Sequence, residues 1–272
     1  MKLNRTGRLR VGLRLAARLA GLALLFSGGL LLELLYRLLL GPAWYLRPAG
    51  QRLIGRWMRS AAWLLGLRIE AQCPPCEAPV LMVANHISWL DIIAINATST
   101  ATFVAKAPVR DWPILGRLAA LSGTRFLERE SLAGLCDLVR DVATLLQQGA
   151  RVAVFPEGTS TSGEHVLPFS SALFQGAINA EANVQAITLR YGEPGLPDAL
   201  APFVGEQDFL SHLLPLLRRT HTRVSITFAP PVAAAGRQRQ SLADYTRQQI
   251  LEQLQRGTAT IGKMSTRPRR AA

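Results

Sequence analysis

The sequence has few of the residues that build metal and redox centres. Only three of its 272 residues are cysteines and four are histidines. None of His165, His212 and His221 has another His, Cys or acid at metal-ligand spacing. Cys73-Pro-Pro-Cys76 has the C-x-x-C form, but it lies in a proline-rich stretch and lacks the second pair of a zinc site. We therefore expect reduced thiols, no metal ion and no bound cofactor, with Cys136 in the core.

Two common hydrolase signatures are also missing. The chain has no G-x-S-x-G elbow and no G-x-x-x-x-G-K-[ST] loop, so the sequence supports neither a serine hydrolase nor nucleotide hydrolysis. It contains no internal repeat and no long low-complexity run. The chemistry must be sought in other residues.

Acidic residues are scarce at both ends of the chain. Residues 1–72 hold twelve Lys and Arg but only two acids, and residues 263–272 hold four basic residues and no acid. The rest of the chain is close to neutral. Basic ends on a neutral body are typical of proteins that bind an anionic membrane surface or nucleic acid. The N-terminal arginines alternate with leucines and tryptophans, which favours an anionic lipid surface over nucleic acid.

Residues 19–40 are almost wholly apolar and long enough to cross a bilayer. Glu33 and Arg37 are spaced to pair on one helix face, and Gly28-Gly29 is a point where a helix can bend. Both flanks of the run are basic, which favours a hairpin or re-entrant anchor with both ends on one side. A single membrane span is the alternative.

An amphipathic helix is expected at about residues 48–66. Its apolar side chains are assigned to lipid and its arginines to headgroups; these are Leu53, Ile54, Trp57, Ala61, Leu64 and Leu65, and Arg52, Arg56 and Arg59. Four aromatic residues suit a membrane interface: Trp44, Tyr45, Trp57 and Trp63. We expect residues 1–69 to be a membrane-anchoring segment.

From residue 79 the pattern alternates between strands and helices, which predicts an α/β domain at residues 70–260 with a layered mixed sheet flanked by helices. The expected strands are 79–84, 101–105, 124–127, 151–155, 184–191 and 224–228, and the expected helices are 91 onward, 113–121, 131–148, 168–182 and 241–255. The last helix should turn Tyr245, Ile250 and Leu254 inward. Residues 261–272 are expected to form a disordered basic tail.

The stretch Asn85-His86-Ile87-Ser88-Trp89-Leu90-Asp91 follows the first of these strands. His86 is expected on the loop between strand and helix, and Asp91 in the first helical turn, with Ser88 as N-cap. A histidine oriented by a carboxylate can take a proton from a hydroxyl that attacks a carbonyl group. A purely structural His–Asp pair is the alternative when this stretch is taken alone.

Two further loops suggest an anion site. Phe155-Pro-Glu-Gly-Thr-Ser160 follows a buried strand, and the backbone N–H groups of Gly158, Thr159 and Ser160 are suited to a phosphate. Beside a phosphate, Glu157 would have to hold an arginine or a hydroxyl. Arg129 is the preferred phosphate ligand because a guanidinium binds phosphate with two hydrogen bonds. Arg125, Glu128 and Glu130 are expected in surface ion pairs.

Taken together, these blocks resemble the 1-acylglycerol-3-phosphate acyltransferases, a family of glycerolipid acyltransferases. The resemblance covers about residues 79–192. Residues 85–91 look like the family block N-H-x-S-x-x-D, Gly123 to Arg129 like G-x-x-F-[ILV]-x-R, and Phe155 to Thr159 like F-P-E-G-T.

The resemblance implies acyl transfer from acyl-CoA or acyl-carrier protein to a membrane lysophospholipid, most simply 1-acylglycerol-3-phosphate. His86 would be the base and Asp91 its orienting partner. Arg129, Glu157, Gly158 and Thr159 would hold the acceptor. Backbone N–H groups near residues 85–88 or in the Gly158 turn would hold the oxyanion. The family implies the cytoplasmic membrane, with the domain facing the cytoplasm.

Two positions depart from the family pattern, since Ala186 stands where a proline is usual and Ser170 where Lys or Arg is common. Both changes bear on the acceptor headgroup. Residues 203–210 and the helix after them look like a branch that includes lyso-ornithine lipid acyltransferases, which makes lyso-ornithine lipid the alternative acceptor. A non-catalytic lipid-binding protein is the other alternative.

Overall fold

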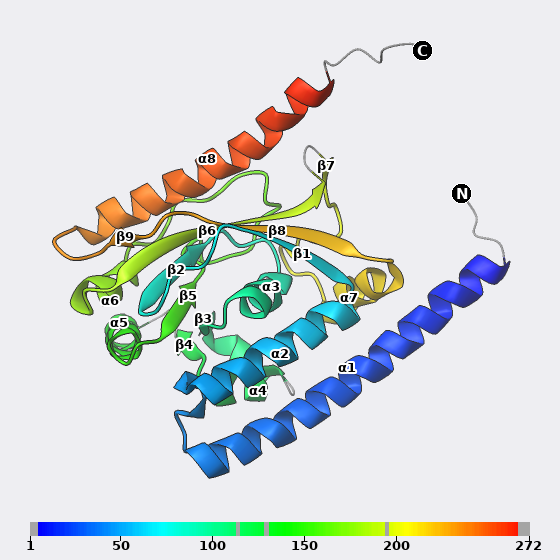
Figure 1. The fold of residues 1–272 in the computed structure, drawn as a ribbon, viewed down its shortest axis with the longest axis horizontal. Helices are drawn as coiled ribbons and strands as arrows, with labels where there is room; N and C mark the ends of the chain where they lie inside the picture. The colour runs from blue at the N-terminus through cyan, green and yellow to red at the C-terminus, as the bar shows by residue number, and fades with distance from the viewer. Residues whose placement is uncertain (1–4, 113–114, 128–130, 194–195, 266–272) are drawn as a thin grey trace.

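The computed structural model describes residues 5–112, 115–127, 131–193 and 196–265. Its centre is one mixed sheet in the order β1-β8-β6-β2-β5-β3-β4, with two short strands, β7 and β9, paired to β6 (Figure 1). The strands are β1 (Leu67–Gln72), β2 (Val80–Ala84), β3 (Thr102–Lys106), β4 (Arg125–Leu127), β5 (Arg151–Val154), β6 (Asn183–Glu193), β7 (Leu196–Pro197), β8 (Thr222–Phe228) and β9 (Val232–Ala233). The predicted layered α/β fold is confirmed.

The strand directions bring the functional loops together. β2 runs parallel to both β5 and β6, and β3 runs parallel to β5 and β4, whereas β8 is antiparallel to β6. The carboxyl ends of five strands therefore meet at one edge of the sheet, where parallel α/β folds place their ligands. The loops after β2, β4 and β5 all leave from this edge.

Helices cover both faces of the sheet. They are α1 (Arg5–Leu40), α2 (Pro48–Leu65), α3 (Leu90–Thr98), α4 (Leu115–Leu121), α5 (Leu132–Gln147), α6 (Phe174–Asn179), α7 (Phe209–Arg218) and α8 (Arg239–Ser265), with 3-10 turns η1 (Trp44–Leu46) and η2 (Ala107–Asp111). Because side chains alternate along a strand, Met82 packs in a core with α2, α3 and α7, whereas Leu81 packs in a second core with α5, α6 and α8. The residues of β6 likewise divide between the two cores according to the side of the sheet that they face.

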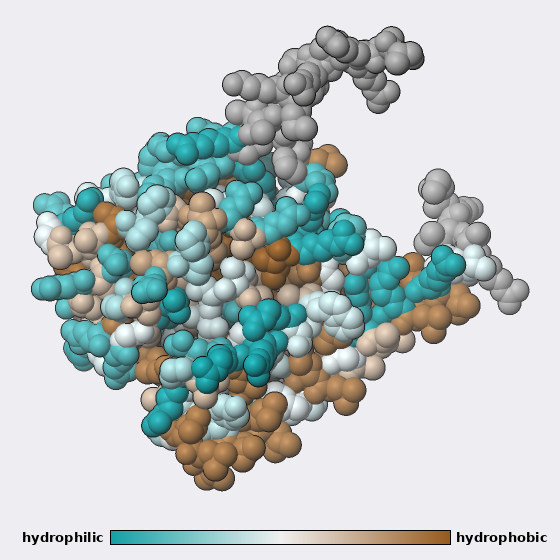
Figure 2. Space-filling view, in the orientation of Figure 1, coloured by the Kyte–Doolittle hydropathy of each residue, from teal (hydrophilic) through white to brown (hydrophobic). Residues whose placement is uncertain are grey.

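The two N-terminal helices form an antiparallel hairpin along one side of the body (Figure 1). Of the described helices, one segment, Thr6–Leu40, is apolar and long enough to cross a membrane, and only 11% of its most apolar window is buried. Figure 2 shows apolar surface gathered over α1. Gly21 and Gly29 allow close packing, since a Cβ on them would lie 2.6 Å from Leu64 Cδ2 and 2.7 Å from Trp57 Cε2. Whether α1 spans the bilayer stays a prediction.

The prediction that α2 turns its apolar face to lipid is wrong for most of that face. Ile54, Ala61 and Leu65 are buried inside the protein because α2 packs on α3 as well as on α1. Trp44 and Tyr45, expected at a membrane interface, are also buried, whereas Trp63 is 76% exposed. Amphipathic periodicity shows which face is apolar, but a protein surface and a bilayer satisfy that face equally well.

Some charged residues of α1 bind the protein body rather than headgroups. The Arg18 guanidinium donates hydrogen bonds to the carbonyl oxygens of Leu217, Arg219 and Thr220 at 2.7–3.0 Å, and Arg14 donates to that of Arg218. They satisfy carbonyl groups left free at the end of α7. The expected Glu33–Arg37 pair is not among the ion pairs of the described residues. Glu33 is instead buried and accepts a hydrogen bond from the Ser122 hydroxyl.

Three local predictions are wrong. The helix expected at 168–182 spans only α6, because the chain before it is held against the loop after β5, where Ser170 N–H donates to Pro156 O. Cys136 is exposed, although all three cysteines are free thiols as expected. Tyr245 is 44% exposed, with Arg237 over its ring, whereas Ile250 is buried. A contact outside the local pattern decides the first of these cases.

The domain limits at 69/70 and 260/261 stay predictions. The segment expected as a tail begins inside α8, which continues to Ser265, and residues 266–272 lie outside the described residues.

Candidate functional site

His86 and Asp91 form a hydrogen-bonded pair at the end of β2. His86 lies in the loop after the strand, and Asp91 lies in the first turn of α3. His86 Nδ1 is 2.8 Å from Asp91 Oδ2. The Asp91 side chain is fully buried, whereas that of His86 is 21% exposed. The pairing predicted from the spacing is present, with the histidine facing outward and the carboxylate beneath it.

Asp91 organises the loop that carries His86. Its Oδ2 also accepts from the N–H groups of Ile87 at 2.7 Å and Ser88 at 3.0 Å, and its Oδ1 accepts from the Tyr191 hydroxyl at 2.8 Å. The prediction that Ser88 caps α3 is wrong, because its buried Oγ has no hydrogen-bond partner among the described residues. The aspartate binds the loop N–H groups itself.

The geometry selects one tautomer of the His86 ring. A carboxylate only accepts hydrogen bonds, so Nδ1 must carry the proton and Nε2 is left with a free lone pair. The ring also stacks on Phe155, with centroids 4.1 Å apart and planes at 19°. The imidazole is therefore held at one face and at one nitrogen, and its Nε2 is available as a base.

Glu157 is bonded to the protein backbone through both carboxylate oxygens. Oε1 accepts from His86 N–H at 2.7 Å, and Oε2 accepts from Leu167 N–H at 2.8 Å. Burial raises the pKa of Glu157 above its ordinary value, although the Leu167 and His86 N–H groups and the His86 ring oppose that rise. This carboxylate connects the loop after β5 to the loop that carries His86.

The Gly158 turn differs from the anion site expected at this edge. Gly158 has a φ of +71°, and its N–H donates to Phe155 O within the turn. Thr159 is exposed, and the Ser160 hydroxyl donates to Phe203 O. One of the three expected backbone donors is thus already used.

The loop around His86 offers few N–H groups for an oxyanion. His86 N–H donates to Glu157, and the next two N–H groups donate to Asp91. The donors suggested at Ile87 and Ser88 are therefore committed to the pair itself in this conformation. An oxyanion would have to be held by other groups or after a rearrangement of this loop.

Arg129, the predicted phosphate ligand, lies outside the described residues, as do Glu128 and Glu130. β4, at the start of the same block, ends at the edge of the sheet that carries His86. Arg125 forms the predicted ion pair, with Nε 3.3 Å from Asp141 Oδ2. Arg125, near the start of this block, thus has a structural role.

The two departures from the family pattern lie in different environments. Ala186 is buried in the core on the α5 and α6 side of the sheet. Ser170 is exposed and bonded to the Glu157 turn through its backbone N–H, which donates to Pro156 O. Ser170 is therefore the departure placed to alter the surroundings of the site.

An aromatic cluster beside the pair was not found from the sequence. Trp89 and Trp112 both pack on Phe209, at centroid distances of 5.1 and 5.7 Å, and Trp89 Nε1–H donates to His212 Nδ1 at 3.1 Å. Burial lowers the pKa of His212, although backbone contacts, chiefly Pro202 O, oppose the change. Trp89 belongs to the His86 block, so an aromatic residue there was a usable signal.

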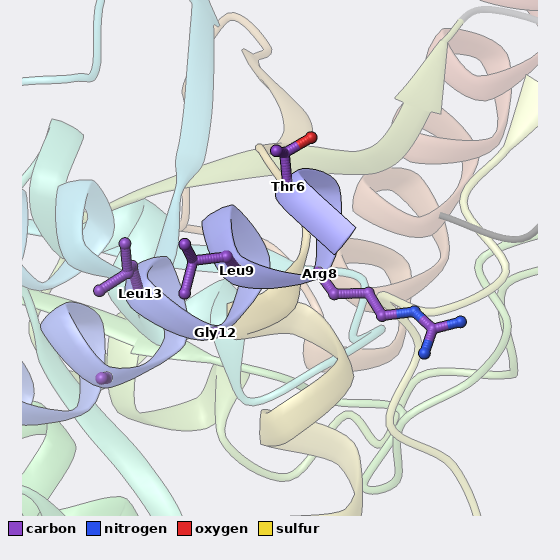
Figure 3. Close-up of a pocket in the computed structure, with 6 residues that line it drawn as sticks. Thr6, Arg8, Leu9, Gly12 and Leu13 are labelled. Carbon is purple, nitrogen blue, oxygen red and sulfur yellow. The ribbon is translucent and has the colours of Figure 1, made fainter. Parts of the chain in front are cut away.

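The groove in Figure 3 does not belong to this site. It runs along the outer face of α1 and is lined by Leu9, Gly12 and Leu13 with their neighbours on the same helix. Within the described part of the chain, no group of three or more His, Cys, Asp or Glu side chains is placed to hold a metal ion.

A partly exposed imidazole oriented by a buried carboxylate, at the carboxyl edge of a mixed sheet, is an arrangement suited to general-base catalysis of group transfer. Residues 67–190 match the model of the family described as Acyltransferase. The structure also aligns with that of the 1-acyl-sn-glycerophosphate acyltransferase PlsC from Thermotoga maritima. That alignment has a TM-score of 0.65 and covers 96% of this chain and 99% of the other, at 19% identity, so it shows a shared fold.

Sequence relatives extend the match. The chain is 39% identical over 247 residues to the lyso-ornithine lipid O-acyltransferase of Pseudomonas aeruginosa, covering 89% of this chain and 93% of the relative. It is 43% identical over 131 residues to the 1-acyl-sn-glycerol-3-phosphate acyltransferase of Neisseria gonorrhoeae, covering 48% of this chain and 51% of the relative. The chain therefore belongs to the family of lysolipid acyltransferases, as its motifs indicated.

Proposed function

We propose that this protein transfers an acyl group from acyl-CoA or acyl-carrier protein to the free hydroxyl of a lysolipid, and that the acceptor is lyso-ornithine lipid. The observation that carries the reaction is the His86–Asp91 pair, in which a partly exposed ring is held at Nδ1 and Nε2 is the base. Asp91 keeps that tautomer and stabilises the imidazolium that forms.

The step needs one base and one leaving group. His86 Nε2 takes the proton of the acceptor hydroxyl as its oxygen attacks the thioester carbonyl carbon. The C–S bond then breaks, and the thiol leaves with the proton that the imidazolium returns. An ester replaces the thioester, so no covalent acyl-enzyme is needed. General-base assistance of this kind contributes roughly 10²- to 10⁴-fold to the rate.

Glu157 has a positioning role in this proposal. Its bond to His86 N–H fixes the backbone from which the base projects, and its bond to Leu167 N–H fixes Glu157 within its own loop, the one after β5. Correct placement of a catalytic group is worth a large factor, because a misplacement of about 1 Å can cost 100-fold. Thr159 and Arg129 stay our predicted contacts to the acceptor, with Gly158 shaping the turn.

The choice of acceptor rests on two observations. The match to the lyso-ornithine lipid enzyme extends over nearly the whole chain, whereas the match to the glycerol-phosphate enzyme covers about half of it. The turn beside the base also offers less to a phosphate than expected, since Gly158 N–H is used internally and Ser170 carries no positive charge. Ornithine has an amine and a carboxylate in place of a phosphate, and this setting suits it better.

The second candidate acceptor is 1-acylglycerol-3-phosphate, which would give phosphatidate. It is favoured by the 43% identity over 131 residues to the Neisseria gonorrhoeae enzyme. Arg129 in the G-x-x-F-[ILV]-x-R block would then be the phosphate ligand, as guanidinium groups commonly are.

The acceptor is reached from a membrane surface. We propose that α1, with its exposed leucines, anchors the protein to the cytoplasmic membrane with the sheet domain facing the cytoplasm. Exposed Arg52, Arg56 and Arg59 on α2 are suited to anionic headgroups. The proposal includes no cofactor beyond the acyl donor and no nucleic-acid partner.

A parallel assay tests the proposal. Purified enzyme is given lyso-ornithine lipid or 1-acylglycerol-3-phosphate, each with acyl-CoA and with acyl-carrier protein. We expect faster acylation of lyso-ornithine lipid, and loss of all transfer in His86→Ala while membrane binding persists. Faster acylation of 1-acylglycerol-3-phosphate would replace the first acceptor by the second. Lipid binding without transfer to either acceptor would identify a non-catalytic protein, and full activity in His86→Ala would refute the mechanism.

A further inference from the structure

Tyr191 contacts the His86–Asp91 pair from β6, the strand that pairs with β2. It lies near the end of β6, and its side chain is 3% exposed, in the core that contains α3 and α7. Its hydroxyl donates to Asp91 Oδ1 at 2.8 Å, across 100 residues of sequence. The other three donors to this carboxylate, His86 Nδ1 and the N–H groups of Ile87 and Ser88, all bond Oδ2. Tyr191 is therefore the partner of the oxygen that the His86 loop does not reach.

The charge of Asp91 is balanced without a fixed cation. Among the described residues, the Asp91 carboxylate forms no ion pair with Lys or Arg. The one basic side chain bonded to it is that of His86. Burial, followed by the charge of Asp91, raises the pKa of Tyr191 well above its ordinary value, so the hydroxyl keeps its proton. The carboxylate is thus stabilised by neutral donors, of which Tyr191 is the one side chain besides the histidine.

The remaining titratable neighbours are few. Asp198 lies beside Tyr191, where its N–H donates to Tyr191 O, and its carboxylate is paired with Arg219 at 2.7 Å. On the other side, Glu157 is bonded to His86 N–H. Among the described residues, the hydrogen bonds and ion pairs bring no other charged group to Tyr191 or to His86.

We propose that Tyr191 is a positioning residue for the acyl-transfer reaction. Its hydroxyl fixes Asp91 Oδ1, so that Oδ2 stays aimed at His86. It also sets how strongly the pair holds a proton on His86. A hydroxyl that donates to a carboxylate withdraws part of its negative charge. The carboxylate then attracts the imidazolium less. The inference rests on the proposed function, in which His86 is the base.

Tyr191→Phe removes only the hydroxyl. We expect kcat to fall about tenfold, as for loss of one hydrogen bond to a charged group, with KM for both substrates nearly unchanged. The acid limb of the pH profile of kcat/KM should move to higher pH, because the carboxylate regains charge. Tyr45→Phe is the matched control, since Tyr45 is also buried and its hydroxyl bonds a charged group, Arg125, instead of Asp91. It should keep the wild-type acid limb.

A double-mutant cycle separates positioning from packing. If Tyr191 acts through Asp91, Tyr191→Phe should cost less than about twofold when added to Asp91→Asn. Equal costs in the two backgrounds, or a lower kcat with an unmoved acid limb, would overturn the inference. If Tyr191→Phe fails to fold, Tyr191→Leu or Tyr191→Met, which also lack a donor and do not titrate, replaces it in the same cycle and is judged by the same acid limb.

One readout does not depend on activity. The C2 proton of His86, assigned by its loss in His86→Ala, can be titrated by NMR in wild type and in Tyr191→Phe. We expect the titration midpoint to rise in the variant, and an unchanged midpoint would refute the role of Tyr191. Absence of acyl transfer in the wild type would instead refute the proposed function, and the NMR result would still decide the tyrosine contact.

Discussion

Glu157 is bonded to the backbone of His86, the proposed base: its Oε1 accepts a 2.7 Å hydrogen bond from His86 N–H. The other oxygen, Oε2, is bonded to Leu167 N–H at 2.8 Å. The glutamate of the F-P-E-G-T block thus acts on the N-H-x-S-x-x-D block, 71 residues earlier in the chain. Two blocks that look independent in the sequence are parts of one loop assembly.

Glu157→Gln tests this connection. A glutamine has one oxygen and one NH₂ group, so one of the two backbone N–H groups would face another donor. We expect kcat to fall about 10- to 100-fold through misplacement of His86, with membrane binding intact. Glu164→Gln is the control, because Glu164 is in the same loop but exposed. Wild-type kcat in Glu157→Gln would show that the bond does not position the base.

His212 makes the stability of the fold depend on pH. Its Nδ1 accepts from Trp89 Nε1–H at 3.1 Å and its Nε2 is 3.0 Å from Pro202 O, an arrangement that requires the neutral ring. Burial lowers its pKa in the folded state. The pKa of His212 is thus lower in the folded protein than in the unfolded chain. The neutral ring therefore stabilises the fold above the unfolded pKa of about 6.5, and this stabilisation is lost as the pH falls through the folded pKa.

We therefore expect the melting temperature to fall as pH is lowered from about 7.5 to about 5. His212→Gln should show a weaker dependence, because its amide nitrogen can still donate to Pro202 O but does not titrate. His165→Gln, at an exposed histidine, should keep the wild-type slope. Thermal unfolding in detergent at a series of pH values measures this, and identical slopes in His212→Gln and wild type would count against it.

Neighbouring glycines in α1 provide a test of the helical hairpin. A Cβ on Gly29 would lie 2.7 Å from the Trp57 ring, whereas one on Gly28 would meet nothing within 4 Å. Each alanine gains about 0.5–1 kcal/mol of helix propensity. Gly28→Ala should keep that gain, whereas Gly29→Ala should lose about 1–3 kcal/mol of stability by displacing Trp57.

Chemical unfolding of the two purified glycine variants gives the comparison. The two positions share the same helix and the same substitution, so the difference reports the contact with α2. If both variants shift the unfolding midpoint alike, α1 does not pack on α2 in the protein.

Variants of Arg18 and Arg10 distinguish arginines of the basic N-terminus that bind the protein body from those that face a membrane. Arg18 donates to Leu217 O, Arg219 O and Thr220 O, whereas Arg10 is exposed. We expect Arg18→Gln to lower the free energy of unfolding by about 1–2 kcal/mol, through carbonyl groups left without partners at the end of α7. Arg10→Gln should keep stability and weaken binding to anionic vesicles by about 1 kcal/mol.

Unfolding midpoints and vesicle sedimentation, measured on both arginine variants, check this pair of outcomes. A stability loss in Arg10→Gln, or none in Arg18→Gln, would contradict the assignment of Arg18 to α7.

Much of the site was predictable because His86 and Asp91 lie close together in the sequence. The five-residue step from His86 to Asp91 places a base on a loop and its carboxylate in the next helical turn, and the structure has this arrangement. Strand–helix alternation predicted the layered sheet, and parallel strands bring the loops after β2 and β5 to one edge. The local pattern also placed α2, as its amphipathic period indicated.

The sequence by itself thus determined most of the elements and the positions of the titratable groups, because hydrophobic period and residue spacing act within a few turns of chain. Tertiary structure alone decided what those groups contact. The face of α2 meets α3 rather than lipid, Cys136 is exposed, and Gly158 N–H closes its own turn. Tyr191 reaches Asp91 only because β6 pairs with β2. Partners that far apart in the chain are set by packing and strand order, which a local pattern does not contain.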